Sequence, residues 1–306
     1  MNVPLLIWTV LAAFALTASL ARLVQLRPVV ANTSLVAARH WAFFAAIPWT
    51  LWLAGQFVVQ VRQDRGWDGL LDHLAYVAAV LSLCPAMQVL GARRPTNRAW
   101  TGFVILPMIV VLCWPVITLA LHGGWQRRLE LETPHLVAYL LVLVMSYGNY
   151  LGGRLTFPAL LTFAGLAFIG TVSAQTKHDV EHGRVEVALG LIVLSLGTLG
   201  GIRRLRRAVW SEDRFNRVWQ EFSTLYGLVW SRRVLDRVNA IAVKQQWPGR
   251  LHADGFHWDR ALEDGTRAEV EHALRWLLRR FVDPAWLDAR LGSTDKMESS
   301  PLAIDT

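Results

Sequence analysis

Two histidines four residues apart are the clearest candidates for chemistry in this sequence. His178 and His182 flank Glu181 in the segment His-Asp-Val-Glu-His. Side chains at positions i and i+4 share one face of a helix, where two imidazoles can bind the same metal ion. The letters also match the H-x-x-E-H pattern of inverted zinc peptidases, but the rest of the chain offers no matching context. The motif therefore indicates a metal site without indicating a peptidase.

Three further histidines, His73, His122 and His135, are expected on the same side of the protein. Imidazole suits zinc, copper and iron, and these three also have the depth that axial haem ligands need. A metal- or haem-dependent membrane redox enzyme is therefore one hypothesis for the function. The alternative is that histidines near a membrane surface simply contact water. A covalently attached c-type haem is excluded because the sequence contains no C-x-x-C-H.

A polar run interrupts one of the apolar stretches. It contains Tyr147, Asn149 and Tyr150, which could contact the neutral or lipid-like substrate of a carrier. More often such side chains form hydrogen bonds between helices, each worth about 0.6 kcal/mol. We see no inverted repeat and expect no ionisable side chain deep in the membrane, and both observations disfavour a carrier.

Seven apolar stretches must position these residues. A helix of about 20 apolar residues crosses a hydrocarbon core of about 30 Å, and its backbone groups must pair within the segment. The chain has 54% hydrophobic and 18% charged residues, whereas soluble proteins have about 25% charged residues. These observations predict an all-α polytopic membrane bundle over residues 1–202. The expected spans are 3–21, 41–61, 74–91, 100–121, 135–153, 156–174 and 186–202.

The charges in this region predict its topology. All eight acidic residues fall into alternate connections between the spans, while most arginines fall into the others. The acids are Asp64, Asp68, Asp72, Glu130, Glu132, Asp179, Glu181 and Glu186. Cytoplasmic loops accumulate Arg and Lys, so we expect a bacterial-type inner membrane, an outside N-terminus and a cytoplasmic C-terminus. The net charge of +8 follows from this topology and indicates membrane lipids as partners, not nucleic acid.

The chain changes character after residue 202. Residues 203–306 contain 18 Lys or Arg and 15 Asp or Glu, which predicts a cytosolic amphipathic helical domain over 203–291 and a disordered tail over 292–306. Within the domain we expect a long helix over 211–245, a strand or turn over 250–258, and a helix capped by Thr266 and Glu269. A last short helix should begin at Asp283-Pro284.

Seven of the fifteen tryptophans lie in this domain. They could fill a small helical core, because large aromatic side chains do so efficiently. Alternatively, Trp219 and Trp230, with Arg232 and Arg233, could form a surface that docks a protein partner, since Trp and Arg are enriched in interfaces. The leading hypothesis is a non-catalytic membrane subunit or assembly scaffold. Cys84 and Cys113 lie within predicted spans, where buried thiols act as small hydrophobic groups.

Overall fold

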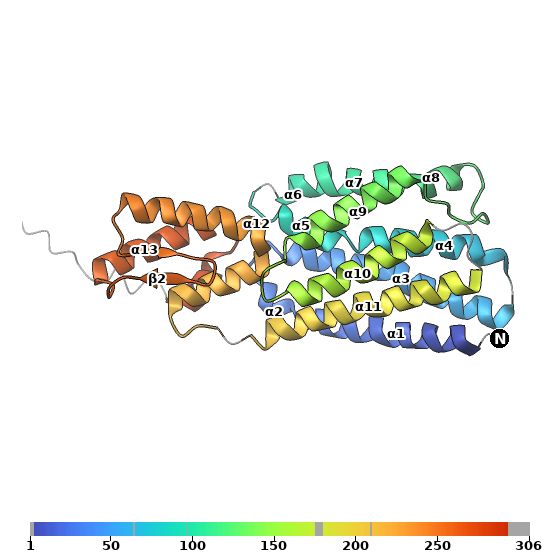
Figure 1. Ribbon diagram of the computed structural model, residues 1–306, viewed down its shortest axis with the longest axis horizontal. Coiled ribbons are helices and arrows are strands. Elements are labelled where there is room, and N and C mark those ends of the chain that lie inside the picture. The colour runs from blue at the N-terminus through green and yellow to red at the C-terminus, as the bar shows by residue number, and fades with distance from the viewer. Residues whose placement is uncertain (1–2, 64, 96, 175–179, 209, 293–306) are drawn as a thin grey trace, which may run out of the picture.

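Two parts follow each other along the longest axis of the molecule. The computed structural model describes residues 3–63, 65–95, 97–174, 180–208 and 210–292. A bundle of helices occupies one part, and the C-terminal helices with a small hairpin extend beyond one end of it (Figure 1). The bundle contains α1 (Val3–Val24), α2 (Arg27–Val30), α3 (Val36–Arg62), η1 (Arg65–Trp67), α4 (Asp68–Leu81), α5 (Cys84–Leu90), α6 (Asn97–Trp100), η2 (Thr101–Ile105), α7 (Leu106–Leu112), α8 (Trp114–Leu121), α9 (Thr133–Gly148), α10 (Thr156–Ser173) and α11 (Val180–Arg206).

Long apolar helices make the bundle a multi-pass membrane type. Among the described residues, five helices are long and apolar enough to cross a membrane: Val3–Val24, Val36–Arg62, Asp68–Leu90, Thr156–Ser173 and Val180–Arg206. The pair Arg98–Leu112 and Trp114–Leu121 is bent by 58° and would be a sixth span if it crosses as one. Helix α9 has 16 residues and is shorter than each of the five helices named above. The helical membrane class is thus confirmed, and the count of seven stays a prediction.

Prolines set where two of these helices break. Pro85 lies in the first turn of α5, directly after α4 ends at Leu81, and Pro115 lies in the first turn of α8 after α7 ends at Leu112. Proline lacks an N–H and clashes with the preceding turn, so a helix readily ends before it. Pro48 lies inside α3, which continues through it.

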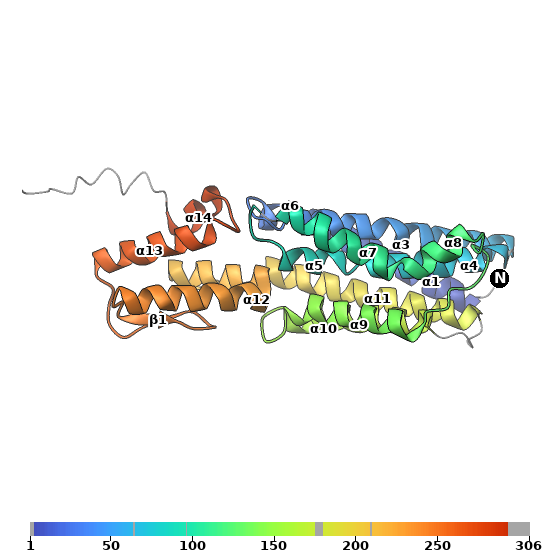
Figure 2. The ribbon, with the colours of Figure 1, turned by 90° about the horizontal axis from the view of Figure 1, so that it is seen from above.

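The two ends of the bundle differ in charge. We call the end where α3, α8 and α10 finish the acid-rich end, and the end where α1, α5, α9 and α11 finish the arginine-rich end. Figures 1 and 2 show that the C-terminal helices lie beyond the arginine-rich end. The connections that the sequence assigns to one side therefore gather at one end of the bundle. Which end faces the cytoplasm stays a prediction.

Helices α10 and α11 pack closely because glycines face the partner backbone. A Cβ added at Gly165 would lie 2.6 Å from the Leu194 backbone nitrogen and 2.7 Å from the Gly190 oxygen. Gly197 has a similar restriction, since a Cβ there would lie 2.7 Å from the Thr162 nitrogen. Small residues allow helix backbones to approach each other in this way.

The C-terminal part consists of α12 (Arg214–Lys244), strands β1 (Gly249–Leu251) and β2 (Phe256–Trp258), α13 (Asp264–Leu278) and α14 (Pro284–Leu291). The strands pair antiparallel, with Gly249 opposite Trp258. Helix α14 begins after Asp283 and at Pro284, as predicted. The capping box at Thr266 and Glu269 is wrong, because α13 begins at Asp264 with Glu263 as its N-cap residue and no side-chain cap.

The core of this C-terminal part includes residues of the bundle. Aromatic rings of α12 and Phe281 form its centre, with Phe222 and Tyr226 stacked at a centroid distance of 4.7 Å. Four residues of the bundle belong to the same buried cluster: Val30 in α2, Leu35 before α3, Val89 in α5 and Ala92 after α5. The core of the C-terminal part therefore extends to residues that precede the predicted boundary at residue 203.

We predict that Gly165→Ala destabilises the protein, whereas Gly200→Ala does not. Overpacking costs about 1–3 kcal/mol, and at Gly165 the added methyl group meets backbone atoms that cannot rotate away. Gly200 lies in α11, and the nearest atom to a Cβ added there would be Pro158 Cγ at 3.8 Å. Both free cysteines are buried, so the rate at which a thiol-reactive dye labels them on heating reports unfolding. Equal melting temperatures for the two variants would contradict the close packing.

Candidate functional site

The histidines predicted as metal ligands are dispersed in the structure. His73 is 1% exposed in α4, and its ring packs edge-on against Trp125 with 5.8 Å between centroids. His122 places Nδ1 2.7 Å from the Thr118 carbonyl oxygen. Over the described residues, no three His, Cys, Asp or Glu side chains are grouped so that they could hold a metal ion. His178 lies outside the described residues, so a site shared by His178, Glu181 and His182 stays a prediction.

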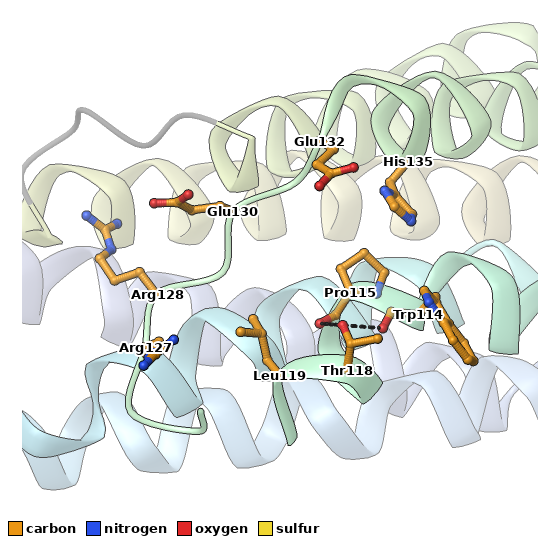
Figure 3. Close-up of a pocket in the computed structure, with 9 residues that line it drawn as sticks. All are labelled: Trp114, Pro115, Thr118, Leu119, Arg127, Arg128, Glu130, Glu132 and His135. Carbon is orange, nitrogen blue, oxygen red and sulfur yellow. Dashed lines mark hydrogen bonds between the residues drawn. The ribbon is translucent and has the colours of Figure 1, made fainter. Parts of the chain in front are cut away.

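His135 does line a pocket of about 760 Å³ at the acid-rich end. The pocket lies beside α8, the short helix that follows the 58° bend. Figure 3 shows Arg127, Arg128 and Glu130 toward one end of the pocket, with Glu132 and His135 near Trp114 toward the other. Charges of both signs suit water or a hydrated, zwitterionic solute.

Two ion pairs at the acid-rich end join three segments of the bundle. Arg184 of α11 pairs with Asp68 of α4, and their side chains are only 7% and 14% exposed. Arg128 places Nε 3.1 Å from Asp72 Oδ2. A carboxylate that is removed from water needs such a partner. The sequence showed these four charged residues, but their pairing depends on contacts between residues 56 and 116 positions apart, for which the sequence carries no local signal.

At the opposite end of the bundle, α12 is interrupted in its middle. Gly227 has φ +73°, inside the helix that runs from Arg214 to Lys244. This left-handed conformation favours glycine and removes hydrogen bonds from the helix ladder around it. Gly227 therefore breaks the helix, and the backbone groups on either side of it need other partners.

Asn149, the residue that follows α9, supplies those partners. Its Nδ2 donates to the Tyr226 carbonyl oxygen at 3.1 Å, and its Oδ1 accepts from the Val229 N–H at 2.9 Å. Its own carbonyl oxygen accepts from the Leu228 N–H at 2.7 Å. A Cβ at Gly227 would lie 2.5 Å from that oxygen. One buried asparagine thus bridges the break and attaches α12 to the bundle.

Other hydrogen bonds at the arginine-rich end strengthen this attachment. Trp230 Nε1 donates to the Val89 carbonyl oxygen at 2.9 Å. Burial raises the pKa of Tyr226 to about 12, so its hydroxyl stays protonated and donates to the Phe281 carbonyl oxygen at 2.7 Å. Backbone bonds link the segments directly: Ser34 N–H to Phe281 O, Arg94 N–H to Arg280 O and Asp283 N–H to Asn32 O, at 2.7–2.8 Å. Arg94 also pairs with the Asp283 carboxylate.

These contacts correct the predicted docking surface in part. Trp219 and Trp230 are 2% and 7% exposed and belong to the buried core, although Trp219 also borders the groove described below. Arg232 is exposed, with Nε 3.2 Å from Asp236 Oδ1, and Arg233 lies over the Trp230 ring at 4.9 Å. Only the arginines of the predicted set reach the surface.

A groove of about 660 Å³ runs along this junction. The connection 149–155 forms one wall, one face of α12 forms the other, and the turn at Ala253 and Asp254 closes one side. The groove carries charge at Arg154, Arg232 and Asp254. A hydrogen bond from His257, whose Nε2 lies 3.0 Å from Asp254 Oδ2, lowers the pKa of Asp254 and keeps the carboxylate ionised. This groove is the candidate functional site.

The groove unites two sets of residues that the sequence presented separately. Asn149 and Tyr150 were candidates for contacting a substrate, and Arg232 was a candidate for docking a partner. Tyr147, the third residue of the polar run, faces a different crevice and donates to the Ser82 carbonyl oxygen at 3.1 Å. Comparison with known protein families, curated proteins and solved structures finds no match to this chain.

We predict that Asn149→Leu loosens the break in α12. The variant removes two side-chain hydrogen bonds, each worth about 1 kcal/mol, so amide hydrogen exchange around residues 226–230 should accelerate about tenfold or more. Asn239→Leu is a matched control, because Asn239 makes the same pair of bonds to Leu251 within the C-terminal part. The control should accelerate exchange only in the hairpin. Unchanged exchange around 226–230 in Asn149→Leu would refute the bridging role.

Proposed function

We propose that this protein is a non-catalytic subunit or scaffold of a bacterial-type inner membrane, and that it docks a partner protein through its C-terminal helical part. In this proposal the bent pair α7–α8 and the short helix α9 also cross, which makes seven spans. The N-terminus is then outside and the C-terminus cytoplasmic, because the arginine-rich end faces the cytoplasm.

The observation that carries the proposal is the attachment of α12 to the bundle through Asn149. A surface that is fixed before binding loses less conformational entropy when a partner docks. The hydrogen bonds at Tyr226, Leu228 and Val229 hold the junction groove in one shape. The groove therefore supports a docking function better than a mobile appended domain would.

The charges of the groove support a polypeptide partner. Arg154 and Arg232 offer guanidinium groups to acidic side chains, and Asp254 offers a carboxylate to a basic one. Exposed Leu151 and Leu228, at 45% and 57%, add apolar area between them. An apolar centre with charged groups around it is the usual composition of a specific protein interface.

We predict that Arg232→Glu reduces recovery of the partner about tenfold, because the variant replaces an attractive charge with a repulsive one. The full-length protein would be purified in detergent from the cells that express it naturally, and co-purified proteins would be quantified by mass spectrometry. Arg237→Glu is the control, since Arg237 lies in the same helix and is exposed but does not line the groove. Absence of a stoichiometric partner, or equal recovery with both variants, would contradict the proposal.

A further inference from the structure

A second cavity lies within the bundle, toward the arginine-rich end. It is a crevice of about 160 Å³ between α1, α3 and α11, open to the surroundings of the bundle. Small side chains leave this space, because Ala42, Ala45 and Ala46 of α3 face Ser19 of α1 and Thr198 of α11. Trp49 and Tyr147 also line it.

The polar groups of the crevice have partners within the protein. Ser19 Oγ donates to the Ala15 carbonyl oxygen at 2.9 Å, and Thr198 Oγ1 to the Leu194 oxygen at 3.0 Å. Trp49 Nε1 donates to Ser82 Oγ at 3.0 Å. A polar solute would find few free donors here, whereas a hydrocarbon chain loses nothing by contacting groups that are already paired. The chemistry of the lining therefore selects an apolar occupant.

Each of the three helices that line the crevice carries an arginine near the same end: Arg22 in α1, Arg39 in α3 and Arg206 in α11. Arg39 lies one helical turn before Ala42 in α3, and its buried Nε has no hydrogen-bond partner among the described residues. Arg22 of α1 and Arg206 of α11 both donate to Gln25 Oε1. The ends of these three helices pack together through Leu23, Ala42 and Ile202 in one apolar cluster, and Leu23 and Ala42 of this cluster also line the crevice.

No acidic residue lies close to these three arginines in the sequence. The first acidic residue of the chain is Asp64, and none occurs between Glu186 and Glu212. These helix ends therefore contribute basic side chains, and no acidic ones, next to an apolar crevice. Basic pockets between membrane helices at the cytoplasmic side bind anionic lipid headgroups, and guanidinium groups form strong hydrogen bonds to phosphate.

We propose that the crevice binds one acyl chain of an anionic phospholipid, whose phosphate is bound by Arg39 with Arg22 and Arg206. An apolar cavity of about 150 Å³ holds one benzene molecule, so the crevice takes about six carbons of the chain. The rest of the lipid lies along the bundle surface. This inference depends on the membrane location and not on the docking of a partner.

The test titrates the detergent-purified full-length protein with phosphatidylglycerol or phosphatidylcholine and counts bound lipids by native mass spectrometry. We expect at least fivefold stronger binding of phosphatidylglycerol to the unmodified protein. Arg39→Gln should reduce this preference to less than twofold, whereas Arg98→Gln, at the same end but in α6, should preserve it. Ala42→Leu fills the crevice and should weaken binding of both lipids at least fivefold.

The control for the added volume of Ala42→Leu is Ala120→Leu, which adds the same side-chain volume in α8 away from the crevice. Melting temperatures of all variants, measured by thiol labelling, establish that each is folded. The proposal is overturned if the unmodified protein binds the two lipids equally, or if folded Ala42→Leu binds phosphatidylglycerol as the unmodified protein does.

Discussion

The break in α12 at Gly227 is the constraint on which the arrangement of the whole molecule depends. A continuous helix of this length would pair the backbone groups of its middle turns internally, and these groups would need no partners from the bundle. The left-handed conformation at Gly227 leaves backbone N–H and C=O groups without partners inside the helix. Asn149 forms hydrogen bonds to these groups with both its side chain and its carbonyl oxygen. Because these bonds are buried, leaving them unmade would cost about 1–3 kcal/mol for each orphaned group. The position of the C-terminal part follows from that requirement.

The two ends of the bundle use charge in different ways. At the acid-rich end, Asp68 and Asp72 are neutralised by Arg184 and Arg128, which joins helices and leaves a pocket of mixed charge. At the arginine-rich end, Arg94 pairs with Asp283, while Arg22, Arg39 and Arg206 lie near the ends of the three helices that line an apolar crevice. The first pattern stabilises the bundle. The proposed partner and the proposed lipid would both bind at the second end.

The sequence predicted the helices and their breaks better than the contacts between them. Span lengths and the positions of Pro85 and Pro115 depend on local chemistry, so the helical class, the breaks and the gathering of alternate connections could be read from residue order. The periodicity of α12 correctly placed Trp219 and Trp230 on one apolar face, but it could not distinguish a core from a docking surface. Asn149 and Tyr226 are 77 positions apart, and no local sequence pattern predicts a hydrogen bond between them. For the same reason the described histidines, although on one side in sequence, do not converge.

We infer that the bundle and the C-terminal part move as one rigid body. The most direct measurement is the distance distribution between spin labels at Leu160→Cys in α10 and Arg237→Cys in α12, both exposed positions. The buried Cys84 and Cys113 should remain unlabelled. We expect a single narrow distribution, which broadens when Gly227→Ala forces a side chain against Asn149. A broad distribution in the otherwise unmodified protein, or a narrow one that Gly227→Ala leaves unchanged, would contradict it.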